Sequence, residues 1–389
     1  MKKMIPLSVP NFEGNEEAYV NQAVKEGWVS TGGAAITELE KKLQEFLHVP
    51  AVAACQSGTA ALHLSLIEAG VQPGVHVIVP TLTFIAAVNP VRYQFAEPIF
   101  MDCDDSLCMD AGKLRRFCEE ECTDSEEGLR YKKTGKPVTA IVVVHVFGNL
   151  ADMEAIMEIA EEFGLQVIED ATEALGSYFT SGRYKGCMAG TIGDFGAYSF
   201  NGNKIITTGG GGAVTARDAN RLAHIKYLST QAKDDGLYYV HNEIGYNYRM
   251  TNLQAALGVA QMEELPEFIK RKNRNYEIYR KQLADCEMGV LLPFREDISS
   301  NKWFYSLVID KTRVTMAIPQ IIEALSAKGI QTRPIWGLIH NQLPYREDVS
   351  YEIEKAVYYS ERIINLPCST NITEEEIIYV CDTLKQLLG

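Results

Sequence analysis

Short apolar runs alternate with amphipathic stretches between residues 51 and 216, and this alternation constrains the fold more than any other feature. Continuous runs of four or five apolar residues are typical of strands that are covered on both faces. Five such runs are predicted to be buried strands, at residues 77–80, 98–101, 140–144, 166–169 and 196–200. Three stretches between them are predicted to be helices, at residues 59–69, 86–93 and 152–163. The alternation predicts an α/β fold with a mainly parallel, doubly wound sheet.

The pattern changes after residue 264. Apolar and aromatic residues recur every three or four positions among basic ones at 265–283, which predicts a long amphipathic helix. A strand and two helices are expected beyond it, at residues 304–309, 317–328 and 373–388. We therefore expect a large α/β domain at 1–264, including an N-terminal segment, and a small C-terminal α/β domain at 265–389.

One charged segment interrupts the alternation. Residues 119–137 are rich in Glu and Lys and end in Gly and Pro. This composition is typical of a surface loop, so we expect a solvated excursion before the strand at 140–144. The composition of the segment indicates no function.

The charge balance and the scattered cysteines exclude several classes of function. The chain of 389 residues has a net charge of −14, and nucleic-acid phosphates are bound by Lys and Arg stripes, so no nucleic-acid partner is expected. The chain begins without the apolar stretch of a signal peptide, and it contains no apolar run of about 18 residues that would span a membrane. Nine cysteines without CxxC pairs and seven dispersed histidines indicate free thiols, a cytoplasmic location and no metal site.

A lysine stands in a polar turn of the segment YSFNGNKIITTGGGGAV, residues 198–214. A strand is predicted to end at Phe200, and a second short strand, Ile205–Ile206, is predicted to lead into four glycines. A lysine shielded from water can act as an amine nucleophile toward an aldehyde. The glycines would let the chain approach a bulky ligand closely. Lys204 is thus a candidate Schiff-base lysine, although an isolated loop lysine is more often a solvated charge.

A carboxylate stands at the end of the predicted strand in VIEDATEALGS, residues 167–177. Ligands of open parallel sheets bind outside the carboxyl ends of the strands. A buried carboxylate there needs a cationic partner, and a protonated pyridine nitrogen would be one. Asp170 could equally cap a helix N-terminus. Glu173 could complete a capping box or contact the same ligand ring.

Two further motifs also follow predicted strands. Ser57, Gly58 and Thr59 precede an apolar helix, and free N–H groups at a helix start form a ready anion site. The same residues would serve as an ordinary helix cap. Phe84 could lie flat on a ligand ring or belong to the core. Together with Lys204, these motifs would supply a phosphate cup, a ring stack, a pyridinium partner and an amine in one site.

The order of these motifs resembles the DegT/StrS-type sugar aminotransferases. The segments that carry the resemblance are SGTAALHLSL, PTLTFIAAVNP, VIEDATEALGS, SFNGNKIITTGGGGAV and IGYNYRMTNLQAALGVAQM. It extends from about Ile5 to Tyr345. The resemblance implies a fold-type I, aspartate-aminotransferase-like architecture with a mainly parallel sheet of the seven-stranded type, pyridoxal 5'-phosphate as cofactor, and a homodimer with shared active sites.

The resemblance also assigns roles to single residues. It implies that Lys204 binds the cofactor covalently, that Asp170 pairs with its pyridine nitrogen, that Phe84 stacks on the ring and that Glu173 lies near the ring hydroxyl. The phosphate would be held by Ser57, Gly58, Thr59, Ser199 and, from the neighbouring subunit, Asn247. The substrate side would be formed by Trp28, Val29, Ser30, Asn201, Arg249, Trp336 and His340.

The expected reaction moves the amino group of L-glutamate to the 4-keto carbon of a nucleotide-linked 4-keto-6-deoxy sugar. Family members with a histidine in place of Lys204 are dehydratases, so the lysine favours amino transfer. The SFNGNK turn looks like that of enzymes acting on UDP-linked N-acetylhexosamines in bacillosamine and legionaminic acid pathways. The charged segment followed by VHVFGN looks like the legionaminic branch.

Four alternatives stay open. A GDP-perosamine-type aminotransferase would share a similar GNK turn, a dehydratase would make a 3-deoxy sugar, and a regulator would bind the cofactor without turning over. An amino-acid aminotransferase would need a carboxylate-clamping arginine, for which Arg249 and Arg333 are candidates.

Overall fold

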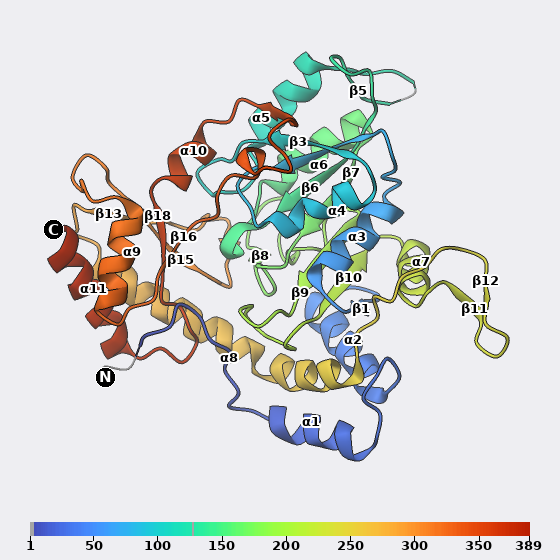
Figure 1. Cartoon of the computed structure of the whole chain (residues 1–389), viewed down its shortest axis with the longest axis horizontal. Helices are drawn as coiled ribbons and strands as arrows, with labels where there is room; N and C mark the ends of the chain where they lie inside the picture. The colour runs from blue at the N-terminus through green and yellow to red at the C-terminus, as the bar shows by residue number, and fades with distance from the viewer. Residues whose placement is uncertain (1–3, 127) are drawn as a thin grey trace.

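An eight-stranded sheet forms the centre of the computed structural model, which describes residues 4–126 and 128–389 (Figure 1). In spatial order its strands are β1 (Ala53–Cys55), β10 (Gly212–Ala216), β9 (Phe195–Ser199), β7 (Gln166–Asp170), β6 (Val138–Val144), β2 (His76–Pro80), β3 (Glu97–Met101) and β17 (Val349–Tyr351). The strands from β9 to β17 are parallel, whereas β10 is antiparallel to both β9 and β1. The predicted mainly parallel sheet is confirmed, with one strand more than expected.

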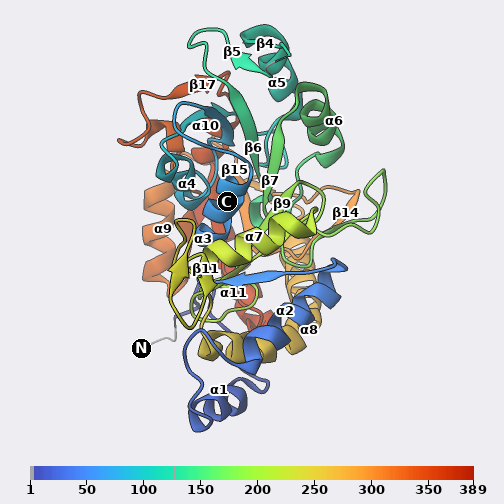
Figure 2. The same cartoon turned by 90° about the vertical axis from the view of Figure 1, so that its right-hand side faces the viewer.

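All five predicted strands are present, each within two residues of its expected bounds. Every residue of β2 and β10 is buried. Since successive side chains of a strand point to opposite faces, both faces of the sheet must be covered there. Helix α3 (Gly58–Glu68) packs against β9 and β10, and α6 (Met153–Phe163) packs against β7. Figure 2 shows β6, β7 and β9 side by side.

Two of the three helices predicted within the sheet region form as expected, namely α3 and α6. The third, predicted at 86–93, is divided into a 3₁₀ turn η1 (Ile85–Ala87) and a short helix α4 (Asn89–Tyr93). Pro90 explains the division, because proline has no N–H to donate to the preceding turn and is favoured in the first turn of a new helix. The remaining α-helices before α8 are α1 (Glu16–Lys25), α2 (Ala34–Leu47), α5 (Ala111–Arg116) and α7 (Ala219–Ser229).

The long helix α8 (Asn252–Gln282) begins 13 residues before the predicted start at 265. Thr251 caps it by accepting the N–H of Gln254, whose side chain in turn accepts the N–H of Thr251. α8 packs against α1, α2 and α11 (Glu374–Leu388), so it connects the two parts of the chain (Figure 1). The expected domain boundary at Leu265 therefore falls inside a continuous helix.

A four-stranded antiparallel sheet forms the smaller C-terminal unit. Its strands in spatial order are β13 (Gly289–Leu291), β15 (Tyr305–Ile309), β18 (Ile363–Leu366) and β16 (Arg333–Pro334). The helical elements beyond α8 are α9 (Ile318–Ala327), η4 (Ile339–Asn341), α10 (Lys355–Ser360) and α11. Contacts between the two parts include the pairing of β17 with β3 in the large sheet and a hydrogen bond from the N–H of Ile5 to the carbonyl of Gly329. The division at Leu265 thus stays a prediction.

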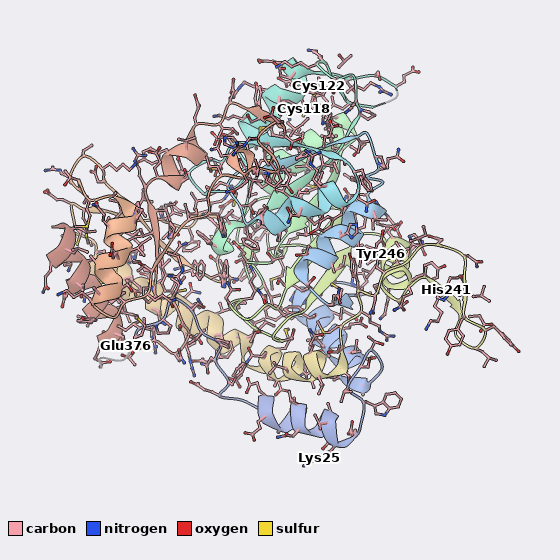
Figure 3. All side chains as sticks on the ribbon, in the orientation of Figure 1. Lys25, Cys118, Cys122, His241, Tyr246 and Glu376 are labelled. Atoms are coloured by element: carbon pink, nitrogen blue, oxygen red, sulfur yellow. The ribbon has the colours of Figure 1, made fainter. Side chains whose placement is uncertain are left out.

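The charged segment at 119–137 is more ordered than the solvated loop that its composition predicts. A π-helical turn, η2 (Phe117–Glu121), leads into a hairpin of β4 (Cys122–Thr123) and β5 (Arg130–Tyr131). Tyr131 is buried with its ring 5.6 Å from that of Phe117. Cys118 and Cys122, also buried, mark this end of the molecule in Figure 3. The buried side chains of the segment therefore join the core of the main body.

Three short features complete the chain. β8 (Tyr178–Phe179) pairs with β14 (Ile298–Ser299), and η3 (Val146–Gly148) follows β6. A hairpin of β11 (Lys233–Asp235) and β12 (Val240–His241) projects from the body beside α7 (Figure 1). Among the described residues, no helix is long and apolar enough to cross a membrane.

Candidate active site

A cavity of about 390 Å³ opens at the carboxyl ends of the parallel strands. The segments following β1, β2, β7 and β9 line it, together with residues from the C-terminal part. β1 reaches the same edge because it and β9 are both antiparallel to β10, and so point the same way. This is the place where open α/β sheets bind ligands, as the sequence predicts.

Ser57, Gly58 and Thr59 at the start of α3 form the predicted phosphate cup. Ser199 and Gly212 pack closely against it. Ser57 caps the helix by accepting the N–H of Ala60 at 3.1 Å. The N–H groups of Gly58 and Thr59, in the first turn, have no acceptor within the helix and lie at the cavity. A Cβ on Gly58 would lie 2.8 Å from the Cβ of Ser199, so glycine is required for this packing.

The glycines of the run at 209–212 do not all have the same role. A Cβ on Gly212 would lie 2.5 Å from the carbonyl carbon of Ser57. Gly212 therefore lets β10 lie against the cup, rather than letting the chain approach a ligand. Gly210 and Gly211 do line the cavity.

The predicted strand Ile205–Ile206 is wrong: both residues are buried in a bend, which is closed by a hydrogen bond from the N–H of Thr208 to the carbonyl of Phe200.

Asp170 is the last residue of β7 and is buried at the cavity wall. One carboxylate oxygen accepts the N–H of Thr172 at 3.0 Å, within a turn that does not continue as a helix. The helix-cap alternative is therefore wrong. Burial raises the pKa of Asp170, with the hydrogen bond from Thr172 opposing it. A carboxylate in this position is stabilised by a cation that enters the cavity.

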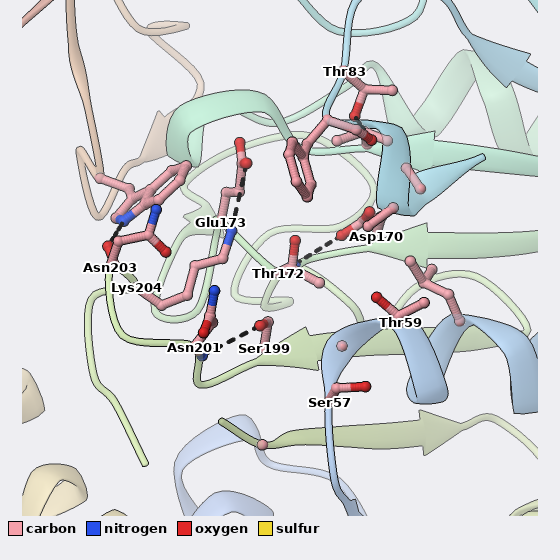
Figure 4. A pocket seen from close by; sticks show the side chains of 18 of the residues that line it. Ser57, Thr59, Thr83, Asp170, Thr172, Glu173, Ser199, Asn201, Asn203 and Lys204 are labelled. Carbon is pink, nitrogen blue, oxygen red and sulfur yellow. Dashed lines mark hydrogen bonds and ion pairs between the residues drawn. The ribbon is translucent and has the colours of Figure 1, made fainter. Parts of the chain in front are cut away.

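Lys204 and Glu173 face each other across the cavity (Figure 4). The Nζ of Lys204 lies 3.5 Å from an Oε of Glu173 and 4.1 Å from the ring centroid of Trp303. The other Oε of Glu173 accepts the N–H of Phe147 at 2.9 Å, so the capping-box alternative for Glu173 is wrong as well. Burial raises the pKa of Glu173 to about 7, against the charge of Lys204.

An aromatic wall from the C-terminal part closes the cavity, and most of it was not predicted. Trp303, Phe304 and the predicted Trp336 line the cavity. The rings of Trp303 and Phe304 stack at 4.1 Å, and Phe147 packs against Trp336 at 4.7 Å. The adjacent Trp303 and Phe304, where the predicted strand at 304–309 begins, were the available signal. Thr172 and Asn203 also line the cavity and were not predicted.

The structure brings together ten of the predicted site residues at the cavity. They are Ser57, Gly58, Thr59, Phe84, Asp170, Glu173, Ser199, Asn201, Lys204 and Trp336. Phe84 is 55% exposed, which leaves its ring free to cover a ligand. Ser199 and Asn201 lie at the end of β9, where the hydroxyl of Ser199 accepts the N–H of Asn201.

Six predicted residues lie away from the cavity of their own chain. Trp28 and Val29 are exposed in the loop between α1 and α2, where Asn252 binds the carbonyls of Trp28 and Ser30. Asn247 is exposed beyond the β11–β12 hairpin. The rings of its two neighbours in sequence, Tyr246 and Tyr248, stack on each other.

The other two are held by neighbouring segments. The backbone of Arg249 forms an isolated antiparallel β-bridge with that of Cys55. The Nδ1 of His340 lies 2.6 Å from the hydroxyl of Thr81, three residues before Phe84. His340 thus connects the C-terminal part with the segment that carries Phe84.

Comparison with known proteins gives a consistent result along the whole chain. Residues 10–385 match the family described as DegT/DnrJ/EryC1/StrS aminotransferase. The GDP-perosamine synthase of Caulobacter vibrioides is 36% identical over 386 residues, which cover 99% of this chain and 98% of that protein. The GDP-perosamine synthase of an Escherichia coli strain is 36% identical over 385 residues, with 99% and 98% covered.

A solved structure of DesI in the presence of its TDP-sugar product superposes with a TM-score of 0.88 at 26% identity, over 100% of this chain and 94% of that one. The fold, the cavity at the strand ends and the sequence relatives therefore agree. The chain belongs to the DegT/DnrJ/EryC1/StrS aminotransferase family and is a pyridoxal-phosphate-dependent sugar aminotransferase.

Proposed function

We propose that the enzyme transfers the amino group of L-glutamate to the 4-keto carbon of a GDP-linked 4-keto-6-deoxy sugar. The GDP-perosamine synthases, 36% identical over nearly their whole length, support this sugar nucleotide. They favour it over the UDP-linked N-acetylhexosamine of the legionaminic acid or bacillosamine branch, which the SFNGNK turn suggested. The observation that carries the proposed reaction is the convergence of Lys204, Glu173 and Asp170 on one cavity.

The residues of the cavity fit pyridoxal phosphate. Asp170 is 4% exposed and raised in pKa by burial, so a protonated ring nitrogen would relieve a carboxylate that the protein alone leaves poorly solvated. The cup of Ser57, Gly58 and Thr59 offers N–H and hydroxyl groups to a phosphate. The cofactor, when bound, supplies an electron sink for the carbanion that forms beside the amino nitrogen.

Lys204 would act as the acid–base group of the transfer. Its amine would remove the proton from the Cα of glutamate and return a proton to the carbon of the sugar that receives nitrogen. A positioned acid–base group of this kind contributes about 10²–10⁴ in rate. Glu173, 3.5 Å away, would hold the lysine ammonium between these steps.

We further propose that the enzyme works as a homodimer with shared sites. Large apolar side chains are exposed on and near the projecting hairpin, namely Leu237, Tyr238, Tyr239, Val240 and Ile244. Exposed apolar patches of this kind are typical of interaction surfaces. Asn247 lies next to them and outside the cavity of its own chain, which fits a role in the neighbouring site.

A panel of sugar nucleotides tests the proposal. The purified enzyme is supplied with L-glutamate and GDP-, UDP- or dTDP-linked 4-keto-6-deoxy sugars, and the amino-sugar product is measured by mass spectrometry. We expect the GDP-linked substrate to give the highest kcat/KM. A preference for the UDP-linked N-acetylhexosamine would restore the first expectation, and a 3-deoxy product would show a dehydratase instead.

A further inference from the structure

A buried lysine without a carboxylate partner lies in the middle of α8. Lys272 is 2% exposed, and its Nζ donates hydrogen bonds to the carbonyl oxygens of Trp303 at 2.7 Å and Cys368 at 2.6 Å. Among the described residues, no Asp or Glu is among the groups that shift the pKa of this amine, which are burial and Cys368. Burial lowers the pKa of Lys272.

Such a group is costly to bury, because a buried ammonium loses its hydration and apolar residues of similar volume usually pack at least as well. Packing alone therefore gives no reason for a lysine at this position. The two carbonyl groups that it binds indicate what it contributes. One of them belongs to the segment that forms the aromatic wall of the cavity.

Trp303 is held from three sides. Its N–H lies 3.0 Å from the side-chain oxygen of Asn301 and 3.1 Å from the carbonyl of Phe147, its carbonyl accepts from Lys272, and its indole N–H donates to the carbonyl of Asn203 at 2.8 Å. The preceding residue, Lys302, has a φ of 51°, in the left-handed region that is unfavourable for residues other than glycine. A segment in this conformation keeps its geometry only while its anchors are present.

The indole ring of Trp303 is in direct contact with the catalytic lysine. The Nζ of Lys204 lies 4.1 Å from the ring centroid, and tryptophan is the ring that attracts ammonium groups most strongly. The same indole binds Asn203, the residue that precedes Lys204. Trp303 therefore contacts both the backbone turn and the amine of Lys204, while Glu173 contacts the amine from another direction.

We propose that Lys272 is a positioning residue for amino transfer: it fixes Trp303, whose ring keeps the amine of Lys204 next to Glu173 whenever that amine is not bonded to the cofactor. This inference rests on the proposed function, in which Lys204 must stay within reach of the substrate carbon after its release. Lys272 does not line the cavity, and of the two carbonyl groups that it binds only that of Trp303 belongs to the cavity wall, so we expect its effect to pass through Trp303.

A double-mutant cycle tests this path. Lys272→Met removes the ammonium and retains an unbranched side chain, and Trp303→Phe retains an aromatic ring with weaker attraction for the amine and no N–H. We expect each single variant to lower kcat about tenfold and to change KM for glutamate and for the sugar nucleotide less than twofold. We expect the double variant to be no slower than the slower single variant, because the two residues act in one chain of contacts.

Lys302→Met is the matched control. Lys302 is a partly buried lysine next to Trp303, with its Nζ 4.1 Å from the ring of Tyr276 and 3.5 Å from an Oε of Glu277, and its side chain lies outside the cavity. Its loss should leave kcat unchanged. If kcat losses of Lys272→Met and Trp303→Phe multiply in the double variant, or if Lys302→Met is as slow as Lys272→Met, the inference is overturned.

A measurement on the cofactor-free protein gives a readout that does not depend on turnover. Labelling of Lys204 by an amine-reactive reagent, followed by peptide mass spectrometry, should change at least threefold in Lys272→Met and in Trp303→Phe and should be unaltered in Lys302→Met. Should Lys272→Met not fold, Trp303→Phe alone still decides whether the ring governs this reactivity. Equal labelling in Trp303→Phe and wild type overturns the inference, whereas a wild-type enzyme that aminates no keto sugar overturns the proposed function.

Discussion

The protonation of Glu173 should make the stability of the folded protein depend on pH. Burial raises its pKa from 4.5 to about 7. At about 1.4 kcal/mol for each pKa unit, ionising Glu173 costs the folded chain about 3 kcal/mol relative to the unfolded chain. Below pH 4.5 the carboxyl group is neutral in both states and this cost is absent. The cost grows as the pH rises from 4.5 to 7, and above pH 7 it is present in full. The folded state therefore loses stability as the pH rises.

Glu173→Gln removes this dependence, because the amide does not ionise. Between pH 5 and pH 8 this ionisation should lower the unfolding free energy of the wild type by roughly 2 to 3 kcal/mol. The variant should lack this decrease. Urea denaturation of the cofactor-free protein, measured by fluorescence at several pH values, gives both free energies. Glu158→Gln, on an exposed position of α6, serves as the control and should follow the wild type. Parallel pH profiles for Glu173→Gln and wild type would refute the reasoning.

Three further substitutions test the site. Lys204→Ala should abolish turnover and the visible absorption of the covalently bound cofactor. A retained visible absorption band and a turnover above a hundredth of the wild-type value would contradict the role assigned to Lys204. Asp170→Asn should still bind the cofactor, seen by absorbance, but lower kcat at least 100-fold, because a neutral amide does not keep the ring nitrogen protonated. Gly212→Ala should weaken cofactor binding at least tenfold in a titration, since its Cβ would lie 2.5 Å from the carbonyl carbon of Ser57, whereas Gly236→Ala, with no neighbour within 4 Å, should bind normally.

The sequence predicts the parts of the fold that depend on local pattern. The strands that end near Asp170 and Ser199 are runs of apolar residues whose burial is visible from their neighbours along the chain. The motifs at these strand ends meet in one cavity because parallel strands bring their carboxyl ends to one edge. These predictions needed no knowledge of distant contacts.

The features that were missed depend on residues far apart in the chain. Trp303 reaches Lys204, about 100 positions earlier, only because the C-terminal part packs across the sheet edge. The role of Gly212 depends on the turn at Ser57, and no local pattern connects them. The apolar pair Ile205–Ile206 predicts a strand, but the burial of both residues arises in a bend that closes on Phe200.

The edge strand β17 has a consequence for how the chain is made. It pairs with β3 although about 250 residues separate them, so the large sheet cannot be completed until nearly the whole chain has left the ribosome. Until then β3 presents an unpaired edge, which is prone to pair with other chains. Pairings between such distant segments also fold slowly. We therefore expect chains that end before Val349 to aggregate during synthesis, and folding to finish only after release.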